Sequence, residues 1–157
     1  MRVPPSGGRP AGCDDGAMTD PAAVVRRYFE IVGDLDSSPD ALRNVLDPAV
    51  RITERPNAIN PRGTVRDRDA AVAGFLAGKR LLAAQTIEVH ELLVSGDRVA
   101  ARATWRGTIA EGAGSLATGA ELVAHIAAWL TVADGRIREH ETFDCYGAPP
   151  SAGGAAA

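Results

Sequence analysis

The first half of the chain carries apolar residues at the three- and four-residue spacing of amphipathic helices. Each apolar run begins after a residue that can cap a helix, and Pro21 and Pro39 each stand near the start of a run, where proline suits the first helical turn. The runs cover residues 21–33, 38–46 and 67–82. The pattern predicts three helices, with a short strand over residues 49–55 between the second and the third.

From Gln85 onward the apolar period changes from helical spacing to two, the period of a strand. Two pairs of such runs flank the dipeptides Gly96-Asp97 and Asp134-Gly135, which favour tight hairpin turns. The runs cover residues 85–95 with 98–109, and residues 121–133 with 136–146. Helices that precede an antiparallel meander predict an α+β domain in which the helices cover one face of the sheet.

Turn length fixes which residues face each other in the two hairpins. A two-residue turn at Gly96-Asp97 places Glu91 opposite Arg102 and His90 opposite Ala103. A two-residue turn at Asp134-Gly135 pairs Ala133 with Arg136. Regular pairing from there places His125 opposite Asp144 and Trp129 opposite His140. A slip of one residue would move these side chains to opposite faces of the sheet.

The composition is that of one globular domain. The chain has 157 residues, 45% of them hydrophobic, which is enough for a single core. Residues 1–17 and 148–157 are rich in proline, glycine or alanine without apolar periodicity, so we expect a disordered leader and a flexible tail around a domain spanning residues 18–147. Met18 directly precedes the first helix signal and is a candidate start of translation.

Charge and cysteine content narrow the classes of partner. The net charge is -3 and the basic residues are scattered, so we expect no nucleic acid partner. No apolar run approaches the length of a membrane span, and the N-terminus lacks the apolar core of a signal peptide. Cys13 and Cys145 form no disulfide framework or metal-binding pattern. We expect a cytoplasmic protein without a membrane partner.

Three groups of segments together carry a family resemblance: Ile52–Asn57 with Asn60–Gly63, Ser95–Arg102 with Trp105–Thr108, and Asp134–Ile137 leading to Phe143–Tyr146. They resemble the SnoaL-like branch of the NTF2-like superfamily. The resemblance covers residues 20–146. It implies a cone in which a curved sheet wraps around the N-terminal helices and a central pocket, with homodimerisation and a small-molecule ligand. The superfamily includes polyketide cyclases, ketosteroid-isomerase-like enzymes, epoxide hydrolases and dehydratases, together with non-catalytic binders, so the resemblance predicts fold more firmly than reaction.

One position departs from the family pattern. Cyclase and epoxide-hydrolase members keep an acidic residue about five positions after the isoleucine that follows the last turn, and this chain has Thr142 there. The nearest carboxylates are Asp144, on the same face of the strand, and Glu141, on the opposite face.

The predicted pairing of His125 with Asp144 is the sharpest candidate for chemistry. A carboxylate beside an imidazole fixes its tautomer and raises its basicity, so His125 could act as general base or acid, oriented by Asp144. His140 and Thr142 would donate hydrogen bonds to an oxyanion, and Trp129 would line the same pocket. Alternatively, Asp144 satisfies His125 structurally, or this face is exposed or a subunit interface. In that case the face with Glu139 and Glu141 lines the cavity.

Two residues outside this hairpin are further candidates for substrate binding. Glu54 ends the first strand, where strand ends meet pocket mouths; the alternative is an exposed acid paired with Arg55 or Arg66. Tyr28 lies on the apolar stripe of the first helix, from which its hydroxyl reaches a cavity or a buried partner. No motif indicates a metal or an organic cofactor.

The leading hypothesis is a cofactor-independent SnoaL-like enzyme. It would cyclise or isomerise an apolar, carbonyl-bearing metabolite of secondary metabolism by acid–base chemistry. The alternatives are a non-catalytic NTF2-like module for ligand binding or dimerisation and, third, an epoxide-hydrolase-like enzyme. The last would need convergent acids and a positioned arginine.

Overall fold

Three helices precede most of a six-stranded sheet in the computed structural model, which describes residues 20–111 and 117–147. The helices are α1 (Pro21–Gly33), α2 (Pro39–Val45) and α3 (Arg68–Leu81). The strands are β1 (Leu46–Glu54), β2 (Thr64–Arg66), β3 (Leu82–Ser95), β4 (Arg98–Ile109), β5 (Glu121–Ala133) and β6 (Arg136–Tyr146). The predicted leader and tail, residues 1–17 and 148–157, lie outside the described residues.

Each helix begins where a side chain satisfies a free backbone N–H group. Asp20, Ser38 and Asp67 accept hydrogen bonds from N–H groups two or three residues further on, at 3.0, 3.1 and 2.8 Å respectively. The predicted starts of the three helices are therefore confirmed. No helix in the described part of the chain combines the length and apolarity needed to cross a membrane.

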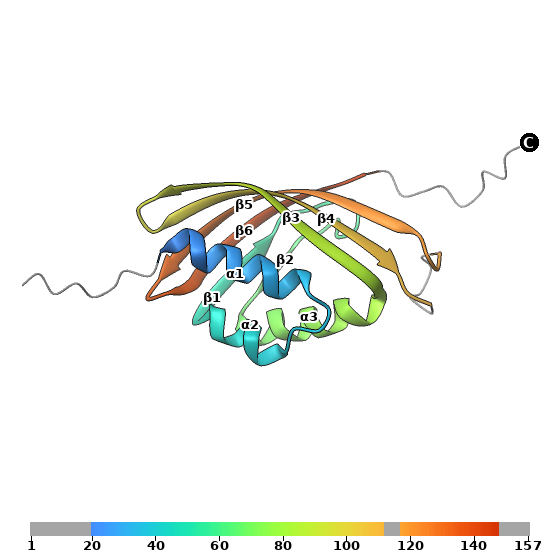
Figure 1. Ribbon diagram of the computed structural model, residues 1–157, viewed down its shortest axis with the longest axis horizontal. Helices are drawn as coiled ribbons and strands as arrows, with labels where there is room; N and C mark the ends of the chain where they lie inside the picture. The colour runs from blue at the N-terminus through green and yellow to red at the C-terminus, as the bar shows by residue number, and fades with distance from the viewer. Residues whose placement is uncertain (1–19, 112–116, 148–157) are drawn as a thin grey trace, which may run out of the picture.

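The sheet has the order β2-β1-β6-β5-β4-β3, and the three helices lie together on its concave side (Figure 1). Strand β1 runs parallel to β6 while the other neighbours are antiparallel, so the sheet is mixed rather than wholly antiparallel. Strand β2, only three residues long, was not predicted. The α+β prediction, with helices covering one sheet face, is confirmed.

The core lies between the helices and the concave face of the sheet. Leu130, Ile137 and Val99 from the sheet are almost completely buried, as is Val25 from α1. Burial of an aliphatic side chain of this size contributes about 1.5–3 kcal/mol. These contacts fix which face of each strand points inward, and therefore which polar residues share that face.

The turn between β5 and β6 has the predicted conformation. Asp134 and Gly135 both have positive φ values, 51° and 71°, as a type I′ turn requires. Ala133 faces Arg136, and the next pair is Val132 with Ile137.

A β-bulge then breaks the predicted register. Thr131 faces Glu139, leaving Arg138 without a partner in the ladder. Every later pair is shifted by one residue: His125 faces Cys145, and Trp129 faces Glu141. The predicted pairings of His125 with Asp144 and of Trp129 with His140 are therefore wrong.

The sequence around Arg138 explains the bulge. Ile137 and His140 are both buried, and the two charged residues between them, Arg138 and Glu139, are both exposed. With regular alternation, Ile137 and His140 would point to opposite faces, and so would Arg138 and Glu139. One extra residue lets Ile137 and His140 both point inward.

The hairpin of β3 and β4 contains a similar irregularity. Glu91 faces Arg102 as predicted, and Arg102 Nε lies 3.5 Å from Glu91 Oε2. Ala103, however, faces Val89, because His90 occupies the register shift. The prediction that His90 faces Ala103 is wrong for the same reason as in the last hairpin.

Candidate functional site

Alternate residues of β6 carry polar side chains to the concave face. His140 and Thr142 are buried, and Asp144 and Tyr146 are partly buried. The parallel pairing of β1 with β6 aligns Ile52 with His140 and Glu54 with Thr142. The bulge at Arg138 thus places an imidazole, a hydroxyl, a carboxyl and a phenol on the face that the helices cover.

Tyr28 and His140 form a buried pair between α1 and β6. Tyr28 Oη and His140 Nδ1 share a 3.2 Å hydrogen bond, and the two rings meet edge to face with centroids 5.3 Å apart. Burial lowers the pKa of His140 to about 4, so the imidazole is neutral at pH 7. Burial, followed by the charge of Asp144, raises the pKa of Tyr28, which keeps its hydroxyl protonated.

The second ring nitrogen of His140 differs from the first in its hydrogen bonding. His140 Nε2 is buried and has no hydrogen-bond partner among the described residues. A buried polar atom of this kind is typical of a site that orders water or a ligand.

Asp144 is the carboxyl group best placed for proton transfer. Its Oδ1 accepts a 2.6 Å hydrogen bond from the Thr142 hydroxyl. Burial raises the pKa of Asp144, with a further contribution from Glu54, while the Thr142 hydrogen bond and the Arg66 charge lower it. A carboxyl group with a raised pKa can exchange protons closer to neutral pH than an exposed one.

Glu54 holds an arginine beside these groups. Glu54 Oε2 lies 3.1 Å from Arg66 Nη1, and Glu54 Oε1 accepts a 2.9 Å hydrogen bond from Asn57. The Glu54 side chain is only 15% exposed, so the interpretation as an exposed strand-end acid is wrong, although the pairing with Arg66 that belonged to it is present. Arg55 instead donates to Glu141 on the outer face, at 2.6 Å.

Arg66 was not predicted as a site residue. It belongs to β2, whose three residues are too few to show a strand period. The available signal is the turn over residues 60–63, which returns the chain so that Thr64 faces Glu54 in the β1–β2 ladder.

A cavity of about 220 Å³ lies between α1, α3 and β1. Tyr28 and Arg66 contribute its polar lining, and the rest is mainly apolar: Val32, Leu42, Leu46, Ile52, Ala71, Gly74 and Phe75. Its volume is below the 300–1,000 Å³ typical of ligand pockets, so only part of a polycyclic molecule would fit in it.

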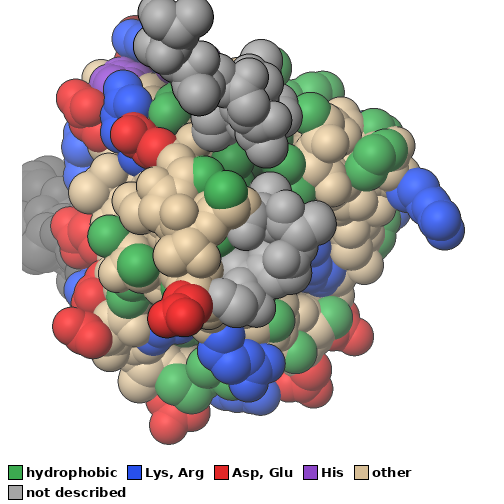
Figure 2. Space-filling view, turned by 90° about the vertical axis from the view of Figure 1, so that its right-hand side faces the viewer, with side chains coloured by type: hydrophobic (Ala, Val, Ile, Leu, Met, Phe, Trp, Pro, Cys, Tyr) green, Lys and Arg blue, Asp and Glu red, His purple; other side chains and the backbone are tan. Residues whose placement is uncertain are grey.

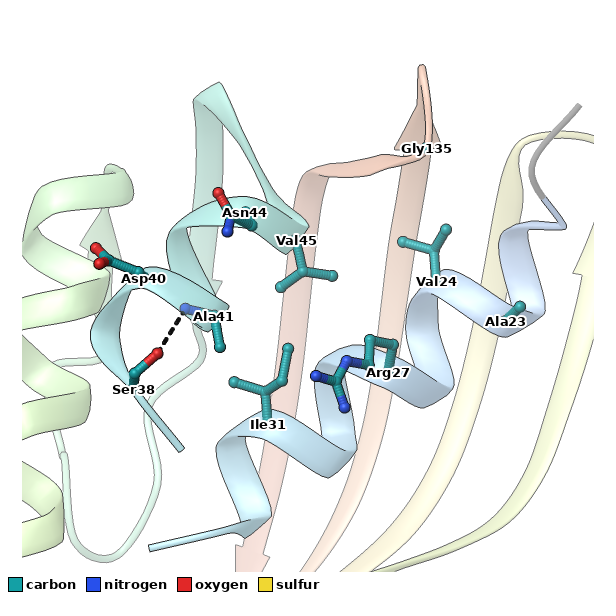
Figure 3. A pocket seen from close by; sticks show the side chains of 10 residues that line it. All are labelled: Ala23, Val24, Arg27, Ile31, Ser38, Asp40, Ala41, Asn44, Val45 and Gly135. Atoms are coloured by element: carbon teal, nitrogen blue, oxygen red, sulfur yellow. Dashed lines mark hydrogen bonds between the residues drawn. The ribbon is translucent and has the colours of Figure 1, made fainter. Parts of the chain in front are cut away.

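A larger groove, of about 600 Å³, lies elsewhere, between α1 and α2 (Figure 3). Its walls include Val24, Ile31 and Val45, and Arg27 and Asp40 are among its few charged residues. None of the predicted site residues lines it. We therefore place the site by its chemical groups rather than by volume.

Two predicted site residues lie on the outer face instead. His125 is exposed, and its Nδ1 lies 3.4 Å from the hydroxyl of Thr104, which also shares a 2.8 Å hydrogen bond with His90 Nε2. These residues and Cys145 line a groove of about 400 Å³. Trp129 is 46% exposed and meets Phe143 edge to face, with ring centroids 5.5 Å apart. The predicted dyad of His125 and Asp144 is therefore absent, because its members point to opposite faces.

Acidic and basic side chains are intermingled over the described part of the side seen in Figure 2. Among residues 20–111 and 117–147, no three His, Cys, Asp or Glu side chains gather as metal ligands would.

Comparison with known proteins identifies relatives of this architecture. Residues 25–140 match the family model described as SnoaL-like domain. IdmH from Streptomyces antibioticus, a proposed polyketide cyclase, is 27% identical with a TM-score of 0.65, covering 80% of this chain and 91% of its own. No curated protein sequence matches the chain.

Two more distant structures share the fold. A proposed SnoaL-like polyketide cyclase from Jannaschia sp. CCS1 is 20% identical, with a TM-score of 0.66 and coverage of 85% of this chain and 91% of that one. A protein from Catenulispora acidiphila with a ketosteroid isomerase-like fold is 16% identical, with a TM-score of 0.60 and coverage of 76% and 83%. The predicted cone-shaped NTF2-like fold is confirmed.

Proposed function

Because the chain belongs to the SnoaL-like domain family, we propose that it is a cofactor-independent enzyme of secondary metabolism that cyclises or isomerises an apolar, carbonyl-bearing small metabolite. The similarity to IdmH, a proposed polyketide cyclase, supports this reaction class. The observation that carries the proposal is Asp144, a partly buried carboxyl group of raised pKa on the concave face. The charge of Asp144 helps to raise the pKa of Tyr28, and the charge of Arg66 lowers the pKa of Asp144, so the three groups lie near one another.

In this proposal, Asp144 removes a proton from the carbon next to the substrate carbonyl. The Thr142 hydroxyl fixes the orientation of the carboxylate through its 2.6 Å hydrogen bond. Negative charge then develops on the carbonyl oxygen, and the protonated Tyr28 hydroxyl and the Arg66 guanidinium can stabilise it, since both line the same cavity. Proton return from Asp144 to another carbon completes an isomerisation. In a cyclisation, the enolate carbon instead attacks a second carbonyl, and the oxygen of that carbonyl takes the proton back from Asp144.

His140 and Glu54 position these groups. Neutral His140 holds the Tyr28 hydroxyl, and Glu54 holds Arg66. The unpartnered Nε2 of His140 offers one further hydrogen bond to water or substrate. His125 has no part in this mechanism, because it lies on the outer face beside Cys145.

Proton abstraction can be tested without knowing the natural substrate. We would follow exchange of the C2 protons of 1-tetralone into D₂O by NMR, with wild-type protein and the variants Asp144→Asn and His125→Ala. General acid–base catalysis is worth about 10²–10⁴-fold, so Asp144→Asn should lose the acceleration at least about 100-fold. His125→Ala should match the wild type.

Each other outcome of this experiment has a definite meaning. Loss of exchange in His125→Ala with retention in Asp144→Asn would overturn the assignment of the base. If the wild type binds 1-tetralone but gives no acceleration, the non-catalytic binding module becomes the better description.

A second candidate, hydrolysis of an epoxide, is favoured by one specific observation. Glu54 pairs with Arg66 at 3.1 Å, and the charges of both residues act on the pKa of Asp144, so two acids and an arginine lie near one another, as such an enzyme needs. Asp144 would then remove a proton from water and Tyr28 would protonate the opening oxygen. Hydrolysis of styrene oxide by the wild type but not by Asp144→Asn, without tetralone exchange, would select this reaction.

We also propose that the protein is a cytoplasmic homodimer. The edge-to-face pair of Trp129 and Phe143 is 46% and 40% exposed on the outer face, beside the ion pair of Arg55 and Glu141. Exposed aromatic side chains within a polar rim are typical of protein interfaces. Sedimentation of the wild type as a dimer and of Trp129→Lys as a monomer would support the assignment, and a monomeric wild type would contradict it.

A further inference from the structure

Two aromatic side chains of the concave face meet at the end of the sheet beyond Asp144. Trp105 on β4 and Tyr146 on β6 both flank Ala124 on β5, the three being direct partners in the ladders. Their rings meet edge to face with centroids 6.2 Å apart. Ala124 itself is buried, and its small side chain leaves room for the two rings to approach each other.

The position of the Trp105 ring is fixed by its surroundings. The indole Nε1 donates a 2.9 Å hydrogen bond to Gln85 Oε1, and Gln85 Nε2 in turn donates to the backbone oxygen of Val32 on α1, also at 2.9 Å. The ring lies over Gly107, where an added Cβ would come within 2.3 and 2.5 Å of the indole carbons Cζ2 and Cη2. The indole therefore has its one polar group satisfied and offers a fixed apolar ring.

The aromatic pair is only partly covered, unlike the core beside it. Trp105 and Tyr146 are both partly exposed, whereas Ala103 and Ala124 on the same face are buried. Tyr146 is two residues from Asp144, and burial and the charges of Asp144 and Glu54 raise its pKa to about 12, so its hydroxyl stays protonated. A fixed, partly uncovered aromatic pair stands beside the carboxyl group proposed as the base.

We propose that Trp105 and Tyr146 form a platform that binds the planar aromatic part of the substrate and thereby presents its carbonyl-bearing part to Asp144. This inference rests on the proposed function, and it assigns Trp105 and Tyr146 as the residues that select substrates carrying a planar aromatic ring. The cavity beside Tyr28 holds only about 220 Å³, so the remainder of such a molecule needs a second contact surface. Aromatic rings favour stacked or edge-to-face contact with other rings, which the platform provides.

The two tryptophans of the chain make this testable, since Trp105 lies on the concave face and Trp129 on the outer face. The variant Trp129→Phe keeps Trp105 as the only tryptophan, and Trp105→Phe keeps Trp129. With 1,8-dihydroxyanthraquinone as the probe, we expect saturable quenching of fluorescence in Trp129→Phe. Trp105→Phe should show no saturable quenching, although it still binds the probe by equilibrium dialysis.

Affinity measurements identify the contribution of the aromatic ring itself. Trp105→Leu should weaken probe binding about tenfold, since one aromatic contact is lost, whereas Trp105→Phe should change it less than about threefold. Gly107→Ala should also weaken binding, because the new methyl group displaces the indole. Melting temperatures identify any variant that fails to fold, and the comparison of Leu with Phe at position 105 does not depend on Gly107→Ala.

Three results would overturn the platform: no saturable binding to the wild type, equal affinity of Trp105→Leu and wild type, or saturable quenching of Trp129. Its failure is distinguishable from failure of the proposed chemistry. If Asp144→Asn loses tetralone exchange while Trp105→Leu binds the probe normally, the chemistry stands and the platform is wrong. If Trp105→Leu loses the probe while Asp144→Asn keeps exchange, the platform stands and the chemistry is wrong.

Discussion

The two faces of the last hairpin carry the same kinds of residue in very different surroundings. The concave face has His140 with Thr142 and Asp144, and the outer face has His125 with Thr104 and Cys145. His140 is 7% exposed and its pKa is lowered to about 4, whereas His125 is exposed at the edge of a groove. An imidazole and a carboxyl group on neighbouring strands therefore define a site only once the register has decided which of them is buried.

An engineered cross-link gives the sharpest test of that register, because its result is all or none. His125→Cys, in a background with Cys13→Ser, should form a disulfide with Cys145, since direct partners in an antiparallel ladder have Cα atoms about 4.5–5.5 Å apart. Mass spectrometry after mild oxidation would measure it. Ala124→Cys is the matched control, because regular pairing without the bulge would place it opposite Cys145. A cross-link in that control alone would refute the register.

Stability should also differ sharply between two positions of β5 that face opposite ways. Leu130→Ala should lower the free energy of unfolding by about 2–5 kcal/mol, because Leu130 is 1% exposed and its removal leaves a cavity. His125→Ala should cost about 0.5 kcal/mol or less, since the His125 side chain is exposed and its contact with Thr104 is long, at 3.4 Å. Urea unfolding would measure both. Similar losses for the two variants would contradict the assignment of faces.

Much of the fold was predictable from local signals. The caps at Asp20, Ser38 and Asp67 and the Asp134-Gly135 turn act over a few residues, so the sequence contains all the information needed to place them. Strand β2 and the pairing of β1 were harder to predict. The three residues of β2 show no period, and the parallel pairing of β1 with β6 joins segments that are distant in the sequence.

The site was predictable only in part, because it depends on one bulge. Tyr28, Glu54, His140, Thr142 and Asp144 do share the concave side, whereas His125 and Trp129 do not. The charged pair Arg138-Glu139 between two inward positions was the available signal. Arg66 reaches the site through pairing of β2 with β1, which no local pattern predicts.

The buried imidazole should make the stability of the protein sensitive to mild acid. The pKa of His140 falls from 6.5 when unfolded to about 4 when folded, so the unfolded state binds the proton first. Stability from the neutral ring is present above pH 6.5 and is lost as the pH falls toward 4, by about 3 kcal/mol. Comparing urea unfolding of wild type and His140→Gln across this range would measure the difference.

A second variant separates this proton effect from general loss of stability. Leu130→Ala weakens the same face without removing a titrating group, so its stability curve should run parallel to that of the wild type between pH 6.5 and 4. If His140→Gln also runs parallel, the imidazole is not held neutral by burial and the contrast between the two faces is weaker than the structure indicates.

The smallest effect is expected from deleting the extra residue at the bulge. Deleting Arg138 removes a residue that the β5–β6 ladder leaves unpaired, so Val132 with Ile137 and Thr131 with Glu139 can remain partners. The free energy of unfolding should change by no more than about 1 kcal/mol, because the inward residues stay inward. Deleting Glu141, which is paired with Trp129, should instead unfold the protein, since Thr142 and Asp144 would turn outward. Equal loss of stability from both deletions would mean that the extra residue at Arg138 supports the core. The curvature that this residue introduces, and not only the register, would then keep His140 and Asp144 on the concave face.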